Sequence, residues 1–182
     1  MFLGGSRKIN KLNKEVKERL ENIINQQFTI LIGDANGADK VLQQFLKDKN
    51  YQNVFVYCSG NACRNNLGNW ESIKIGEESK TKDLKFYMLK DAEMAKKAEY
   101  GFMLWDGKSS GTLNNVLNLL WRQKKTLIYF SPQKRFYTIS NPVSLIELLN
   151  KCNKEDLRII NSKINYSKRL DELKSIQFEL VD

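Results

Sequence analysis

Histidine is absent from the 182 residues of the chain. This absence excludes histidine general bases, Ser-His-Asp triads and histidine-liganded metal sites. Any catalysis would therefore depend on carboxylates, lysine, tyrosine, cysteine or backbone dipoles. We expect neither a metal nor a cofactor.

Cysteine is scarce, with Cys58, Cys63 and Cys152 only. Cys58 and Cys63 are five positions apart, a spacing that fits neither a C-x-x-C redox pair nor the common zinc motifs. The neighbouring Arg64 would lower the pKa of the Cys63 thiol. Because the chain has no histidine to serve as its base, we do not expect Cys63 to act as a nucleophile.

Long apolar runs are also missing. None approaches the roughly 20 residues that a membrane span requires. The first residues, "MFLGGSRKINK", lack the charged-then-apolar layout of a signal peptide. The sequence therefore predicts a cytoplasmic protein without a membrane partner.

Positive charge exceeds negative charge, with a net value of +9. Such an excess fits an anionic small ligand, a nucleic acid or solubility alone. The excess is spread along the chain, and no basic stretch is interleaved with aromatic residues as in single-strand binders. We favour a mildly cationic surface over a dedicated nucleic-acid face.

Five short apolar segments alternate with segments of helical periodicity, which indicates βαβ units. The sequence thus predicts an α/β fold, a Rossmann-like three-layer sandwich. Its mostly parallel sheet of five or more strands would carry helices on both faces. The expected strands are residues 1–5, 28–32, 53–58, 100–105 and 126–130, and the expected helices are 6–26, 40–49, 81–99, 111–125 and 141–151.

The remaining segments complete this organisation. Residues 131–140 predict a turn and a short extra strand, and 151–182 a C-terminal helical appendage of the domain formed by 1–150. Residues 59–80 read as a long irregular loop, which in a compact domain is usually functional. In this loop Arg64 would clamp a phosphate, and Trp70 would either stack on a base or fill the core.

Ligands of parallel sheets bind outside the carboxyl ends of the strands, and glycines follow three of the predicted strands here. The first such loop reads "LGGSR". Gly4 and Gly5 would offer backbone amides, Ser6 a hydroxyl and Arg7 a bidentate cation. The alternative is a tight turn in which Ser6 caps the next helix.

The second loop, "GDANGAD", carries two carboxylates between its glycines. Asp34 directly follows the strand, where a carboxylate would orient ribose hydroxyls. Asp39 would either contact the ligand or begin its helix, where its charge suits the dipole. The candidate binding residues here are Gly33, Asp34, Ala35, Gly37 and Asp39.

The third loop, "WDGKSSGT", carries the strongest signal. Ser109, Ser110 and Thr112 supply hydroxyls, Gly111 opens the backbone, and the dipole of the following helix points at whatever they hold. A helix cap alone would need only one of these residues. With Asp106, this turn predicts a phosphate or ribose site.

Together, "GGSR", "ILIGDANGAD" and the acidic strand end followed by "SSGT" resemble the SLOG superfamily of Rossmann-like proteins. The superfamily includes the cytokinin-activating LOG phosphoribohydrolases, the DNA-processing protein A mediators and the YspA-like proteins. The resemblance covers residues 1–150 and is nearest to the YspA-like branch through Gly33 to Asp39. It implies a nucleotide with its phosphate on the Ser109–Thr112 turn and its sugar or base near residues 4–7 and Asp34.

The chain departs from the LOG pattern at one position. LOG enzymes carry G-G-x-G-T-x-x-E, and their glutamate serves cleavage of the N-glycosidic bond. Here Asn115 stands in that register, and an amide cannot act as a carboxylate. Asp34 and Asp106 are the candidate catalytic residues that would replace it.

Three functions follow from these observations. The leading one is binding of a nucleotide or nucleotide-derived ligand. The second is an N-glycosidase or deoxyribosyltransferase-like enzyme acting on nucleoside monophosphates. The third is a DNA-binding protein, whose affinity would fall steeply with salt. Because related folds commonly dimerise, we expect a homo-oligomer.

Overall fold

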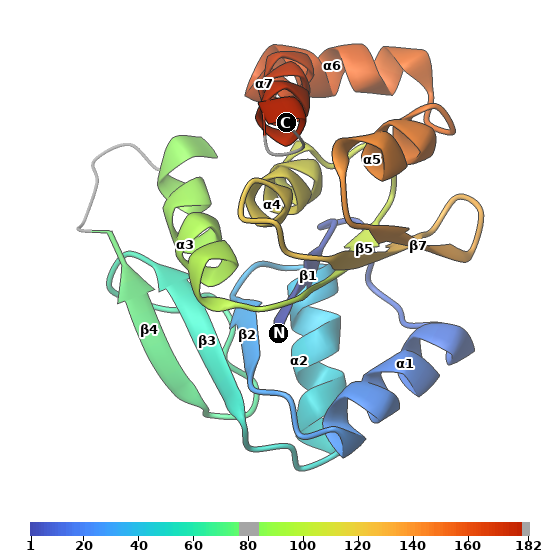
Figure 1. Ribbon diagram of the computed structural model, residues 1–182. Coiled ribbons are helices and arrows are strands. Elements are labelled where there is room, and N and C mark those ends of the chain that lie inside the picture. The colour runs from blue at the N-terminus through green and yellow to red at the C-terminus, as the bar shows by residue number, and fades with distance from the viewer. Residues whose placement is uncertain (77–83, 180–182) are drawn as a thin grey trace.

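The computed structural model describes residues 1–76 and 84–179, in which strands and helices alternate (Figure 1). The strands are β1 Phe2–Gly5, β2 Ile30–Gly33, β3 Val54–Ser59, β4 Glu71–Ile75, β5 Gly101–Trp105, β6 Thr126–Phe130 and β7 Arg135–Ile139. The helices are α1 Lys14–Asn25, α2 Ala38–Asp48, α3 Leu84–Lys97, α4 Ser110–Leu120, α5 Pro142–Leu149, α6 Lys154–Ile164 and α7 Tyr166–Glu179.

One seven-stranded sheet runs in the order β4-β3-β2-β1-β5-β6-β7. Every pair of neighbouring strands is parallel except β6 and β7, which are antiparallel. Figure 1 shows α1 and α2 on one face of the sheet, and α3 and α4 on the other. The predicted Rossmann-like α/β sandwich is confirmed, and its strand order reverses direction at β1, where such folds bind ligands.

The central strands are buried on both faces, as their lack of polar alternation predicted. On β1, Phe2 lies in the apolar cluster beneath α4, and Leu3 lies in the cluster beneath α1 and α2. Both side chains are almost fully buried. The helices therefore shield both faces and leave the strand ends as the place where polar groups meet.

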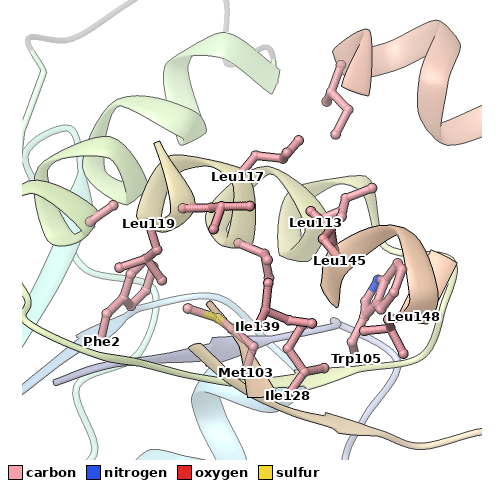
Figure 2. Close-up of a cluster of buried hydrophobic side chains, with 14 of the residues drawn as sticks. Phe2, Met103, Trp105, Leu113, Leu117, Leu119, Ile128, Ile139, Leu145 and Leu148 are labelled. Carbon is pink, nitrogen blue, oxygen red and sulfur yellow. The ribbon is translucent and has the colours of Figure 1, made fainter. Parts of the chain in front are cut away.

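Helix α4 forms the centre of the larger core. Figure 2 shows Leu113 and Leu117 on this helix above Met103 and Ile128 of the sheet. Helix α5 adds further leucines, and α6 and α7 extend the same cluster with Ile160, Ile164, Leu170 and Leu173. The C-terminal helices thus pack against the body of the domain, beside α4.

The first predicted helix, residues 6–26, is wrong in its start. Helix α1 begins at Lys14, and Asn13 caps it by accepting a hydrogen bond from the amide of Val16 at 3.0 Å. Ser6 is therefore not a helix cap. The helical spacing was misleading because Ile9 and Leu12 pack against the core from an irregular segment.

The predicted loop 59–80 contains a strand, β4, which pairs in parallel with β3 at the edge of the sheet. Its residues are half-buried or exposed, and for this reason the segment has no continuous apolar run that would predict a strand. Trp70, just before it, is buried and donates to the carbonyl of Tyr51 at 2.8 Å. It fills the core, as one of its two interpretations held; residues 77–80 lie outside the described residues.

Elsewhere the boundaries move by one or two residues, except that α4 ends at Leu120 and not at residue 125, because the chain turns at Gln123, which has a φ of +55°. Helix α4 begins at Ser110, α3 covers the described part of the predicted helix 81–99, and β7 confirms the extra strand. Pro142 occupies the first turn of α5 behind its cap Asn141, where its missing N–H costs nothing. Among the described helices, none has the length and apolar character needed to cross a membrane.

Candidate functional site

A cavity of about 360 Å³ opens at the carboxyl ends of β1, β2 and β5. This volume lies within the usual range of small-molecule sites. Most of the predicted site residues line this cavity, which we call the strand-end cavity: Gly5, Arg7, Ala35, Asp39, Arg64, Asp106, Ser109, Ser110, Gly111 and Thr112. The three glycine-containing loops therefore meet, as the parallel topology predicts.

The other predicted residues do not line the cavity: Gly4, Ser6, Gly33, Asp34 and Gly37. Ser6 is buried, and its hydroxyl donates to the Asp106 carboxylate at 2.9 Å. It also lies 3.3 Å from the Thr112 hydroxyl. Ser6 thus fastens the end of β1 to the loop that begins α4.

Two glycines of the first two loops are required by packing. A Cβ on Gly5 would lie 2.3 Å from the carbonyl oxygen of Leu104. Gly37 has a φ of +82°, and a Cβ there would lie 2.1 Å from the carbonyl oxygen of Arg7. These glycines let the chain segments approach one another. From the sequence alone, this packing role could not be distinguished from a role in letting a ligand approach the backbone.

Asp106 holds the shape of the loop before α4. Its Oδ1 accepts hydrogen bonds from the amides of Lys108 and Ser109, each at 2.9 Å, in addition to the Ser6 hydroxyl. The carboxylate lines the strand-end cavity, but one of its oxygens is committed to the protein. Asp106 is therefore a positioning residue for the start of α4.

The N-terminus of α4 presents free donors to the cavity. Ser109 caps the helix, and its hydroxyl accepts from the amide and the hydroxyl of Thr112 at 3.3 and 3.0 Å. Within the described chain, the amides of Ser110 and Gly111 have no acceptor. A Cβ on Gly111 would meet nothing nearer than the Ser109 hydroxyl at 4.0 Å. Both residues line the strand-end cavity, so two unpaired amides and the positive end of the helix dipole lie at its wall, which suits an anion.

Asp34 is paired with Arg64 and does not line the cavity. Its carboxylate accepts from the Arg64 amide and Nε at 3.0 Å each, and from Nη2 at 2.6 Å. Burial alone would raise the pKa of Asp34, but these bonds lower it overall. Asp34 thus fixes the guanidinium of Arg64, which lies 4.6 Å from the ring centre of Tyr87 in the cavity wall.

Asp39, Lys90 and Asp91 form a buried charged cluster in the cavity. The Lys90 ammonium donates to Asp91 at 2.7 Å. Gly33 makes room for the cluster, since a Cβ there would lie 2.4 Å from Asp39 Oδ2 and 2.7 Å from Lys90 Nζ. Burial raises the pKa of Asp39 to about 6 despite the nearby Lys90 ammonium. Burial would lower the pKa of Lys90, but Asp91 and Asp39 together raise it.

Asn115 lies beside this cluster. In the orientation that satisfies both of its polar groups, its amide nitrogen donates to Asp91 and to the carbonyl of Gly111, each at 3.1 Å. Where the LOG pattern has a glutamate on α4, this chain has an amide that binds a carboxylate brought from α3. The Asp91 carboxylate therefore lies near the position that the glutamate occupies in the LOG pattern. Asp91 was not among the site residues predicted from the sequence.

Several residues of the cavity were missed from the sequence: Lys8, Tyr87, Lys90, Asp91, Lys108 and Lys163. Only Lys90 had a detectable signal. It lies four positions from both Phe86 and Met94, on the buried stripe of α3. A lysine on an apolar stripe is rarely buried without a partner, so this position could have been singled out.

The cavity carries an excess of positive charge. Its cationic side chains are Arg7, Lys8, Arg64, Lys90, Lys108 and Lys163, against the carboxylates of Asp39, Asp91 and Asp106. Arg64, Lys90 and Lys108 form ion pairs with Asp34, Asp91 and Asp156. Across the described residues, Arg7, Lys8 and Lys163 have no ion-pair partner, so the free charge of the site favours an anionic ligand.

The cysteines do not contribute a nucleophile. Cys58 and Cys63 form a disulfide that closes the segment before Arg64, so the thiol of lowered pKa expected at Cys63 is absent. Burial raises the pKa of Cys152 to about 12. In the described part of the chain, no cluster of acidic and cysteine side chains could hold a metal ion.

Comparison of the chain with protein-family models, with curated proteins and with solved structures finds no match. The resemblance to the SLOG superfamily therefore stays a prediction that depends on the three loops alone.

Proposed function

We propose that the protein binds a nucleotide or a nucleotide-derived ligand in the strand-end cavity, with a phosphate on the Ser109–Thr112 turn. The observation that carries this proposal is the pair of free amides at Ser110 and Gly111, above which the cavity is open. Unpaired cations from the β1–α1 loop line the same cavity. Amides at a helix N-terminus together with cations are a common arrangement for phosphate.

The rest of the cavity fits a sugar and a base. Asp39 and Asp91 supply oxygen acceptors for ribose hydroxyls, and Asn115 keeps Asp91 in place. Tyr87, Phe2, Met88 and Met94 give the cavity its apolar part, against which a base would pack. The resemblance of the three loop sequences to the SLOG superfamily supports the same proposal.

Gly111→Ala separates ligand binding from folding. The added methyl group meets only the Ser109 hydroxyl, at 4.0 Å, an ordinary van der Waals contact, and alanine favours a helix over glycine by up to about 1 kcal/mol. We expect the melting temperature of the free protein to stay the same or to rise by about 3 °C. Nucleotide affinity should fall by roughly tenfold, because the methyl group occupies the path of the phosphate.

Calorimetric titration and thermal unfolding of the same variant measure both effects. Val143→Ala on the solvent-facing side of α5 is the control, since Val143 lies far along the chain from the loops and is 61% exposed. Unchanged affinity in Gly111→Ala would contradict the placement of the phosphate.

A thermal-shift screen tests the proposed function directly. The purified protein is heated with nucleoside mono-, di- and triphosphates, cyclic nucleotides and ADP-ribose. A ligand that binds only the folded state raises the melting temperature by mass action. The proposal expects at least one such rise, and a flat result across the whole series would refute it.

A second candidate function, an N-glycosidase acting on nucleoside monophosphates, has one specific observation in its favour. The cavity contains the carboxylates of Asp39 and Asp91, and a pKa of about 6 at Asp39 suits a general acid or base near neutrality. The candidate residues thus become Asp39 and Asp91, since Asp34 does not line the cavity and Asp106 accepts three hydrogen bonds that shape the loop before α4. Chromatography of each thermal-shift mixture would detect released base; an intact ligand would exclude this activity.

A further inference from the structure

Helix α6 supplies part of the wall of the strand-end cavity. Lys163, near its C-terminal end, lines the cavity. Near its other end, Asp156 forms an ion pair with Lys108 at 3.1 Å, and Lys108 lies in the loop that begins α4. The C-terminal helices therefore contact the proposed phosphate turn in addition to packing against the core.

The Lys108–Asp156 ion pair and the contact of Lys163 with the cavity lie at different points along α6. Asp156 and Lys163 are seven residues apart, which is two turns or about 10 Å along a helix axis. Both lie on the same side of α6 as the buried Ile160 and Ile164, by helical spacing. Lys163 thus reaches the cavity two turns beyond the Lys108–Asp156 ion pair.

Helix α6 is a firm support for Lys163. Ile160 and Ile164 are buried in the cluster beneath α4. The following helix, α7, is held to α4 by Arg169, whose guanidinium donates to Asn114 and Asn118 at 2.8 Å each. Because Lys163 has no ion-pair partner among the described residues, its ammonium is available to a ligand in the cavity, and the packing of α6 fixes the backbone that carries it.

We propose that Lys163 forms a second anionic subsite, so that the preferred ligand carries two linked phosphates. The chemical class is a nucleoside diphosphate or a conjugate of one. The first phosphate would occupy the amides of Ser110 and Gly111, and the second would extend along α6 to Lys163. This inference depends on the proposed function, since it deepens the specificity of the same cavity.

Titration calorimetry with matched nucleotides tests the inference. The monophosphate and the diphosphate of each ribonucleoside are titrated into the wild type, Lys163→Ala and Lys154→Ala, in buffer without divalent cations. Lys154 is on the same helix and does not line the strand-end cavity, so its variant controls for the loss of one positive charge.

We expect the wild type and Lys154→Ala to bind the diphosphate roughly tenfold more tightly than the monophosphate. In Lys163→Ala this preference should disappear while monophosphate affinity changes by less than about twofold. Equal affinities in the wild type, or the same loss in both lysine variants, would overturn the second subsite and leave the proposed function standing. Failure of every nucleotide to bind the wild type would overturn both.

Discussion

Replacing Arg64 with alanine is expected to lower the free energy of unfolding by about 3 kcal/mol at pH 7. The side chain of Asp34 is only 1% exposed and accepts three hydrogen bonds from Arg64. Arg64→Ala keeps the bond from the backbone amide but removes the two bonds from the guanidinium and its positive charge, which offset the cost of burying the Asp34 carboxylate. For a chain of this length the melting temperature should fall by about 10 °C.

The effect of Arg64→Ala should depend on pH. The pKa of Asp34 is lowered in the folded protein, so the stability that this carboxylate contributes is present above its ordinary value of 3.8 and is lost as the pH falls through the folded value. The difference in the free energy of unfolding between Arg64→Ala and the wild type should therefore become smaller in acid. Urea unfolding at pH 7 and at pH 3.5 measures it.

Arg158→Ala is the matched control. Arg158 forms an ion pair with Glu155 on the surface of α6, with side chains 80% and 69% exposed. Surface pairs of this kind contribute less than about 1 kcal/mol. If Arg64→Ala and Arg158→Ala lower stability equally, Asp34 is not held by Arg64 as described.

Asp39→Asn is expected to stabilise the free protein at pH 8 by about 3 kcal/mol. Burial raises the pKa of Asp39 from 3.8 to about 6. Its contribution to stability is therefore full below pH 3.8 and is lost as the pH rises through about 6. Asparagine avoids the ionisation and can still accept the bond that the amide of Ala35 donates to Asp39.

The gain in the free energy of unfolding of Asp39→Asn over the wild type should grow between pH 4 and 6 and stay constant above pH 6. Urea unfolding across pH 4 to 8 measures it, and a difference that does not vary with pH would contradict the assignment. A residue that destabilises the fold at neutral pH is typical of binding and catalytic sites. Asp39→Asn should therefore weaken ligand binding while it strengthens folding.

Most of the fold follows from the sequence. Apolar strands that alternate with helical periodicity predicted the sheet, because strands covered on both faces carry no polar alternation. β4 was missed because an edge strand exposes its side chains. The start of α1 was misplaced because Ile9 and Leu12 pack against the core without forming a helix.

The candidate site was predictable as far as local loops define it. The carboxyl ends of parallel strands meet, so the three glycine-containing loops were placed together correctly. The sequence could not predict which of the neighbouring carboxylates faces the cavity, because this depends on residues far along the chain. Arg64 pairs with Asp34, whereas Asp39 lies beside Lys90 in the cavity. Lys163 approaches only through the packing of α6 against α4.

An amide-resolved NMR titration of the wild type with ribonucleoside monophosphates tests the proposed phosphate site at the N-terminus of α4. We predict that the amide signals of Ser110 and Gly111 shift most strongly and saturate together. The signals of Lys125 and Thr138, at the opposite end of the strands in a second cavity, should stay in place. Saturable shifts confined to that second cavity, or no shifts at all, would contradict the phosphate site on α4.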